Sequence, residues 1–166
     1  MNNELTRKDI ADMEAEIEHR TVVVRKELLE EVKRARAFGD LSENFEYHVA
    51  KKAKNETESR IRYLERMIRT AVIIEDAAAG EAGVNTKVTV RMEDSGKEES
   101  FTIVTTVRGN SLKGFISVES PLGKALLGHK AGDRVHVEVN PQISYDVTLL
   151  SVEDAGADGG ATIRNY

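Results

Sequence analysis

The chain has 166 residues, which is enough for one domain or two small ones. It contains no cysteine, and this excludes disulfide bonds, thiol nucleophiles, thiolate zinc sites and iron–sulfur clusters. The formal charge of −5 argues against a protein that grips duplex nucleic acid through a large basic surface. No apolar span of about 18 residues and no signal-peptide pattern is present, so we expect a cytoplasmic protein without membrane attachment.

The first half of the chain has the pattern of two long helices joined by one short turn. Between residues 1 and 79 the only glycine or proline is Gly39, and both residue types are unfavourable inside a helix. We expect one helix over 6–38 and a second over 42–74, arranged antiparallel by the turn at Gly39. Their apolar residues recur at the spacing of a coiled-coil seam. The expected seam residues are Ile10, Met13, Ile17, Val24, Leu28, Val32, Ala35 and Phe38 in the first helix and Ala50, Thr57, Ile61, Leu64, Ile68 and Ala71 in the second.

The second half changes to short strand-like runs. A segment of small residues over 77–85 is typical of a linker, and Pro121 followed by Gly128 frames one short helix. The sequence therefore predicts an α+β protein with a coiled-coil hairpin over 1–76, a small antiparallel sheet domain over 86–153 and a mobile tail over 154–166. The expected strands are 86–92, 100–104, 114–118, 134–139 and 145–152.

The turn between the two predicted helices is acidic. Asp40, Glu43 and Glu46 fall within eight residues without a basic residue among them, and lysines and arginines follow on both helices. One interpretation is structural: Asp40 would be the N-cap of the second helix and Glu43 its third residue, the spacing of a capping box. The other interpretation is functional. Two ionised carboxylates would contribute to a divalent-cation site that a second molecule completes.

The sequence from Ala35 to His48, ARAFGDLSENFEYH, resembles the tip of the GreA/GreB family of bacterial transcript cleavage factors. The resemblance extends over residues 5–152 and includes the run SVESPLGKALLG at 117–128. Three features depart from the usual family pattern: Phe45 stands where a small residue is common, Asn55-Glu56-Thr57 replaces a Gly-Phe pair, and a Phe-Gly before Val84 is missing.

The resemblance implies a fold and a mechanism. A C-terminal domain of FKBP-like fold would dock on RNA polymerase, while the coiled coil enters the secondary channel. Asp40 and Glu43 would help to hold a second magnesium ion there, and the polymerase would cleave its backtracked RNA. The implied contacts with RNA or polymerase are Arg36, Ser42, Lys51 and Lys52, and the implied docking residues are Ser120, Pro121 and Leu122. The expected partners are RNA polymerase and the nascent RNA 3′ end, and the expected state is a monomer.

The sequence leaves other functions open. An inhibitory relative would occupy the channel without promoting cleavage, although Asp40-Leu41-Ser42-Glu43-Asn44 is intact. A prolyl isomerase or chaperone would need an aromatic pocket, for which the sheet domain offers few residues. A stand-alone nuclease is the third alternative. No nucleophile elbow, Walker A loop or dinucleotide fingerprint is present, so we expect an accessory factor and not an independent enzyme.

Overall fold

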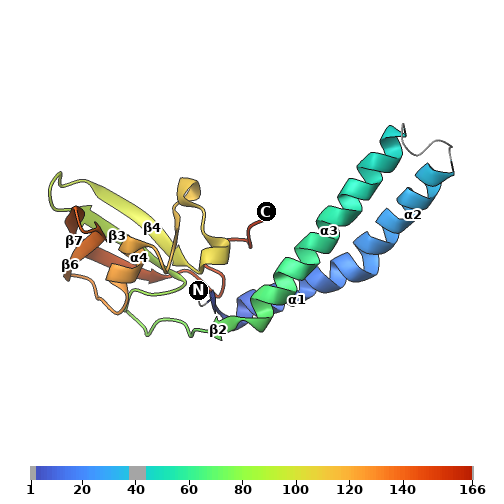
Figure 1. The fold of residues 1–166 in the computed structure, drawn as a ribbon. Helices are drawn as coiled ribbons and strands as arrows, with labels where there is room; N and C mark the ends of the chain where they lie inside the picture. Colours follow the sequence, from blue (N-terminus) through green and yellow to red (C-terminus); the bar gives the residue numbers. More distant parts are fainter. Residues whose placement is uncertain (1–2, 38–43, 166) are drawn as a thin grey trace. The chain divides into compact units, whose positions relative to one another are not determined.

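The computed structural model describes residues 3–37 and 44–165, which form two compact units (Figure 1). One unit spans 10–71 and is a helical hairpin. The other combines 4–9 with 72–165 and is built on a five-stranded sheet with a short helix. The predicted α+β class is therefore confirmed. Of the helices in these described ranges, none combines the length and the apolar character needed to cross a membrane.

The hairpin consists of two helical arms. The first arm runs without a break through α1 (Arg7–His19), a π-helical turn (Arg20–Val24) and α2 (Arg25–Arg36), and the second arm is α3 (Phe45–Arg69). The two predicted helices are thus confirmed, with Phe38 outside the described residues. The expected extension of the second helix to residue 74 is wrong. Residues Ala71–Ile73 form β2, which pairs with β1 (Asn3–Leu5), because the N-terminal strand supplies hydrogen-bond partners there.

The seam between the arms is apolar for most of its length. In α3 most of the buried residues are separated by three or seven positions, which keeps them on one face of the helix, as a coiled-coil seam requires. They are Tyr47, Ala50, Thr57, Arg60, Ile61, Leu64 and Met67. Four of the predicted seam residues, Ala50, Thr57, Ile61 and Leu64, are among them. Ile68 is only half-buried.

A polar layer interrupts this seam. Arg60 donates two hydrogen bonds to the carboxylate of Glu16, Nε at 2.8 Å and one Nη at 3.1 Å, and its side chain is only 5% exposed. Arg20 donates to the same carboxylate at 2.8 Å. Both arginines favour the ionised form, and the hydrogen bond from Arg60 is the largest influence that lowers the pKa of Glu16 from its ordinary value of 4.5.

The lowered pKa of Glu16 predicts an acid-dependent loss of stability. The ion pairs contribute fully above pH 4.5, the ordinary value, and are lost as the pH falls through the lower pKa of the folded state. Glu16→Gln is expected to lower the free energy of unfolding at pH 7 by about 1–3 kcal/mol, because two arginines lose their anionic partner. Urea unfolding from pH 7 down to pH 3 should show the two proteins converging. A constant difference across this range would contradict the assignment.

The second unit contains a mixed sheet. Its strand order is β5-β4-β3-β7-β6, formed by β3 (Thr86–Met92), β4 (Glu98–Val104), β5 (Phe115–Ser117), β6 (Arg134–Asn140) and β7 (Ile143–Asp154). All pairs are antiparallel except β4 with β5, which is parallel. The expectation of a purely antiparallel sheet is therefore wrong at this edge. Between these strands the chain passes through two short 3-10 turns, so β5 returns in the direction of β4.

The core of this unit lies between the sheet and α4 (Pro121–Leu126), which packs against β6. It is almost entirely aliphatic, as the low aromatic content of the sequence requires. Its buried members are Ala82, Val88, Val90, Ile103, Val118, Leu122, Leu126, Val135, Val137, Val147 and Leu149. Burial of this apolar surface is the main stabilising contribution to the domain.

A buried ion pair joins the beginning of the chain to this domain. Thr6 and Asp9 form a capping box at the start of α1, in which the Thr6 N–H donates to the Asp9 carboxylate at 2.9 Å and the Asp9 N–H donates to Thr6 Oγ1 at 3.2 Å. The second Asp9 oxygen accepts from Arg108 Nε. The two side chains are 1% and 2% exposed. Arg108 also donates from Nη1 to the carbonyl of Ala161 at 2.9 Å.

The segment after β7 makes backbone contacts with the same domain. The Ala155 N–H donates to the Asn85 carbonyl, and Asn85 Nδ2 donates to the Ala157 carbonyl, each at 2.9 Å. Further along, the Arg164 N–H donates to the Val107 carbonyl at 2.8 Å. The sequence predicts a mobile tail over 154–166; the described part of it, up to residue 165, is instead hydrogen bonded along much of its length.

Candidate functional site at the end of the helical hairpin

The predicted site lies where the two helical arms are connected. Residues 38–43, which include Asp40, Ser42 and Glu43, fall outside the described residues. The structure describes both flanks of this segment, Ala35–Ala37 at the end of the first arm and Asn44 onward in the second. These flanks determine which side chains accompany the acidic connection.

Asn44 is the N-cap of α3. Its backbone is extended, with φ −80° and ψ 98°, and its Oδ1 accepts a hydrogen bond from the Tyr47 N–H at 3.0 Å. Its Nδ2 donates to the carbonyl of Ala35 at 2.6 Å. One side chain therefore bonds an N–H at the start of the second arm and a carbonyl at the end of the first. The N-cap of α3 is thus Asn44, whereas Asp40 and Glu43, the residues of the capping-box interpretation, lie outside the described residues.

Removing this cap is expected to loosen the end of the hairpin. Asn44→Ala loses both hydrogen bonds, and loss of an N-cap lowers stability by about 1 kcal/mol. Asn44→Asp keeps the accepting oxygen but not the amide that donates to Ala35, so it should lie between the alanine variant and the unmodified protein. Hydrogen exchange at the amide of Tyr47 should accelerate in the alanine variant. Unchanged exchange there would contradict the capping role.

Tyr47 organises the basic residues beside the connection. Its side chain is buried among the seam residues of α3. Arg36 from the first arm lies 5.8 Å from the ring centroid, and Lys51 from the second lies 5.9 Å from it. Cations at this distance are attracted by the ring electrons. The ring thus holds one cation from each arm close to the acidic connection, while the neighbouring ring of His48 meets it edge-on at 5.5 Å.

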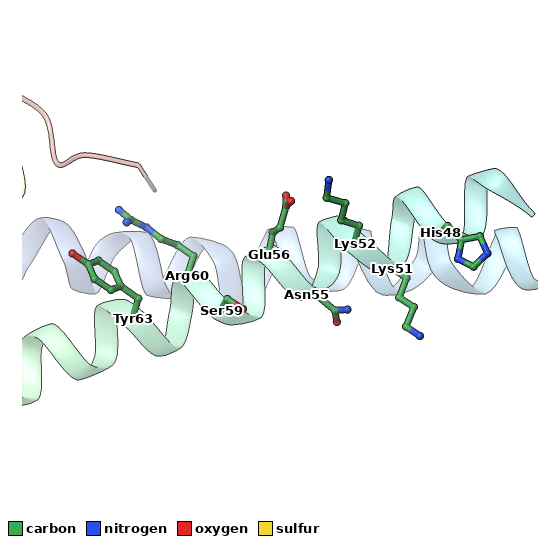
Figure 2. A pocket seen from close by; sticks show the side chains of 8 residues that line it. All are labelled: His48, Lys51, Lys52, Asn55, Glu56, Ser59, Arg60 and Tyr63. Atoms are coloured by element: carbon green, nitrogen blue, oxygen red, sulfur yellow. The ribbon is translucent and has the colours of Figure 1, made fainter.

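One face of α3 continues this basic region away from the connection. A hollow of about 600 Å³ follows the helix for four turns (Figure 2). Lys51 and Lys52 are exposed and leave the helix in different directions, so they can reach two different partners. Glu56 is the only acidic residue of the set. The lining residues are His48, Lys51, Lys52, Asn55, Glu56, Ser59, Arg60 and Tyr63.

The predicted docking residues lie at the start of α4, in the other unit. Ser120 is the N-cap and accepts from the Gly123 N–H at 3.1 Å, and Pro121 is the exposed first residue of the helix. Leu122 points into the domain core with 9% exposure. Only glycine fits at position 123, because a Cβ there would lie 2.3 Å from the Ser117 carbonyl oxygen. Of the three docking residues, Pro121 offers surface, whereas Leu122 supports it from within.

Comparison with known proteins covers nearly the whole chain. The family described as "Transcription elongation factor, N-terminal" matches residues 3–73, and "Transcription elongation factor, GreA/GreB, C-term" matches residues 77–154. Transcription elongation factor GreA of Chloroflexus aurantiacus is 45% identical over 150 residues, which are 89% of this chain and 95% of that protein. The GreA of Limosilactobacillus fermentum is 43% identical over 145 residues, 86% and 91% of the two chains.

Among solved structures, GreA factor homolog 1 (Gfh1) of Thermus thermophilus is similar to 92% of this chain and 99% of its own. The sequence identity is 25% and the TM-score 0.43.

Proposed function

The chain belongs to the GreA/GreB family of transcription elongation factors, and on this premise we propose that it acts in trans on RNA polymerase. The hairpin enters the secondary channel and promotes cleavage of backtracked RNA by the polymerase itself. The factor works as a monomer in the cytoplasm and is not an enzyme alone. The similarity to transcription elongation factors GreA supports the role in elongation; the channel and the cleavage step are the proposal.

The pairing of Arg36 and Lys51 over the ring of Tyr47 is the observation that carries this proposal. It places two cations, one from each arm, next to the connection that contains Asp40 and Glu43. Lysine and arginine bind RNA phosphates without regard to sequence. An RNA 3′ end displaced by backtracking can have any sequence, so contacts of this kind suit it. We include the exposed Lys52 and, within the connection, Ser42 among the proposed contacts.

The acidic residues of the connection suit magnesium in the kind of ligand they offer. Magnesium prefers oxygen ligands and often takes one or two protein carboxylates, with substrate phosphates completing its shell. Asp40 and Glu43 would hold it together with groups of the polymerase, and the ion would activate a water molecule and stabilise developing charge. Across residues 3–37 and 44–165, no cluster of three His, Asp or Glu side chains offers another metal site. A shared site is therefore the arrangement we propose.

Docking is assigned to the sheet domain. The start of α4 presents Pro121 and the exposed Lys124 to solvent, held by the Ser120 cap and by the core contact of Leu122. A rigid, capped helix start is a suitable surface for specific binding because little side-chain freedom is lost on contact. The hairpin then needs no high affinity of its own.

A stalled, backtracked elongation complex tests the proposal. Adding the protein should shorten the RNA from its 3′ end and restore elongation when nucleotides are supplied. The same RNA without polymerase should stay intact, which separates the proposal from a stand-alone nuclease. If the protein binds the complex and blocks nucleotide addition without cleavage, it is an inhibitory relative and the proposal fails.

A further inference from the structure

The burial pattern of the first arm changes phase at the π turn. Before the turn, the positions facing α3 follow a coiled-coil repeat of three and four residues. If that repeat continued, Val24, Glu27, Glu31 and Arg34 would face the seam; Val24, the last residue of the π turn, is half-buried, but the other three are exposed. Beyond the turn, the positions that are buried or half-buried lie one residue later than this repeat. At seam spacing they are Ile10, Met13, Ile17 and Arg20 before the turn, and Arg25, Leu28, Val32 and Ala35 after it.

The π turn accounts for this displacement. The Arg25 N–H donates to the carbonyl of Arg20, five residues earlier, where an α-helix would use the fourth. This turn therefore contains one residue more than an α-helical turn. Beyond it, the seam residues lie one position later in the sequence than an uninterrupted repeat would place them. Val22 and Val23, inside the turn, are 62% and 39% exposed and contribute little to the seam. The first arm therefore carries a one-residue insertion relative to an uninterrupted repeat.

Both ends of the turn are tied to adjacent residues of α3. At its start, Arg20 donates to Thr57 Oγ1 at 3.1 Å as well as to Glu16. At its end, Arg25 makes a two-pronged contact with Glu58, with hydrogen bonds of 2.7 and 2.9 Å. Thr57 and Glu58 are consecutive residues, so five residues of the first arm are held against one step of the second. An insertion held in this way cannot move along the helix without breaking these contacts.

A gain in folding stability does not explain well why these polar groups lie in the seam. Two guanidinium groups share the Glu16 carboxylate, and Arg60 Nη1 has no hydrogen-bond partner among the described residues. Apolar residues of similar size often give equal or greater stability in such a position. The best-attested use of a polar layer in a coiled coil is to select one register over its alternatives.

We propose that Glu16, Arg20, Arg25, Glu58 and Arg60 form a register clamp that holds the inserted residue at Arg20–Val24. The clamp sets the phase of the tip-proximal half of the hairpin, residues 25–36 against 45–56. Without the clamp, the additional residue can be accommodated in a neighbouring turn of the first arm. The tip-proximal half of that arm can then pack against α3 in several rotational positions. These five are positioning residues. Only their effect on cleavage rests on the proposed function.

Distance measurement between spin labels tests the clamp in the full chain. Because the protein has no cysteine, two introduced cysteines are the only labelled sites. The pair Glu27→Cys and Glu46→Cys reports on the tip-proximal half, and the pair Glu14→Cys and Glu65→Cys on the other half. All four positions are exposed. Replacing Glu16, Arg20, Arg25, Glu58 and Arg60 by Met should broaden the distance distribution of the first pair and leave that of the second narrow.

Deleting Val22 in the methionine variant is the decisive control. The deletion removes the insertion, brings the seam back to one continuous repeat and should restore a narrow distribution. Val22→Ala, which removes most of the side chain but keeps the insertion, should leave it broad. A narrow distribution at the original distance without the clamp, or a broad one that the deletion does not narrow, would overturn the proposal.

Two further measurements keep the test decisive. If the methionine variant loses its helical circular dichroism, Arg25→Lys, which keeps the charge but not the two-pronged contact, should broaden the first distribution by a smaller amount. An unchanged distribution in that variant counts against the clamp. RNA cleavage should fall in the methionine variant and recover on deletion of Val22. If the unmodified protein stimulates no cleavage, the proposed function fails, whereas the distances still decide the clamp.

Discussion

Asp40→Asn combined with Glu43→Gln is expected to reduce stimulated RNA cleavage by about tenfold or more while the hairpin stays folded. Both changes remove the charge that a shared magnesium ion needs but keep the size and the oxygen atoms of the side chains. Because Asn44 and not Asp40 caps α3, the thermal midpoint should hardly move. The measurement is the rate of 3′-end shortening in a backtracked elongation complex.

Two controls separate metal binding from other roles of these carboxylates. Raising the magnesium concentration should recover part of the lost cleavage, because mass action offsets weaker coordination. The variant should still compete with the unmodified protein for polymerase, since docking is assigned to the sheet domain. Full cleavage activity in the double variant would refute the proposed mechanism, whatever its stability.

Asp9→Ala is expected to lower the free energy of unfolding by about 3–5 kcal/mol, which is the usual effect of breaking a buried ion pair from one side. Arg108 would keep its charge at 2% exposure without the carboxylate of Asp9. The substitution also removes the side chain that accepts from the Thr6 N–H. Chemical unfolding of the full chain measures the loss.

A double-mutant cycle identifies the interaction itself. Arg108→Met alone should also destabilise, but together with Asp9→Ala the loss should be clearly smaller than the sum of the two, because no buried charge is then left without its partner. Arg134→Met serves as the matched control. Its ion pair with Asp146 is exposed and should contribute at most about 1 kcal/mol. Strict additivity of Asp9 and Arg108 would show that the pair does not act as a unit.

The sequence was most informative where one local rule decides the structure. The absence of glycine and proline around Gly39 predicted two long helices, and alternation of apolar residues predicted the strands. Pro121 and Gly128 correctly framed the short helix. These features depend on propensity and periodicity, which neighbouring residues carry.

The features that were missed depend on residues far apart in the chain. No local pattern pairs Asp9 with Arg108, or makes β5 parallel to β4. The π turn did leave a trace, because Val24, Leu28 and Val32 follow one another at two successive steps of four instead of alternating three and four. Asn44 could have been identified as a cap, since asparagine is among the best N-cap residues. Because Asp40 and Glu43 have the spacing of a capping box, the second helix was predicted to begin before Phe45.

The assignment of residues 4–9 to the sheet domain has a consequence for synthesis on the ribosome. The hairpin, residues 10–71, is continuous in sequence and can fold as soon as it emerges. The sheet domain is discontinuous in sequence. Residues 4–9 are synthesised before the hairpin, and Arg108, the partner of Asp9, follows 99 residues after it. Residues 4–9 therefore lack the rest of their domain while the hairpin folds. Residues 3–5 can pair with 71–73 once the hairpin has been made, whereas the carboxylate of Asp9 stays without Arg108 until much more of the sheet domain has emerged.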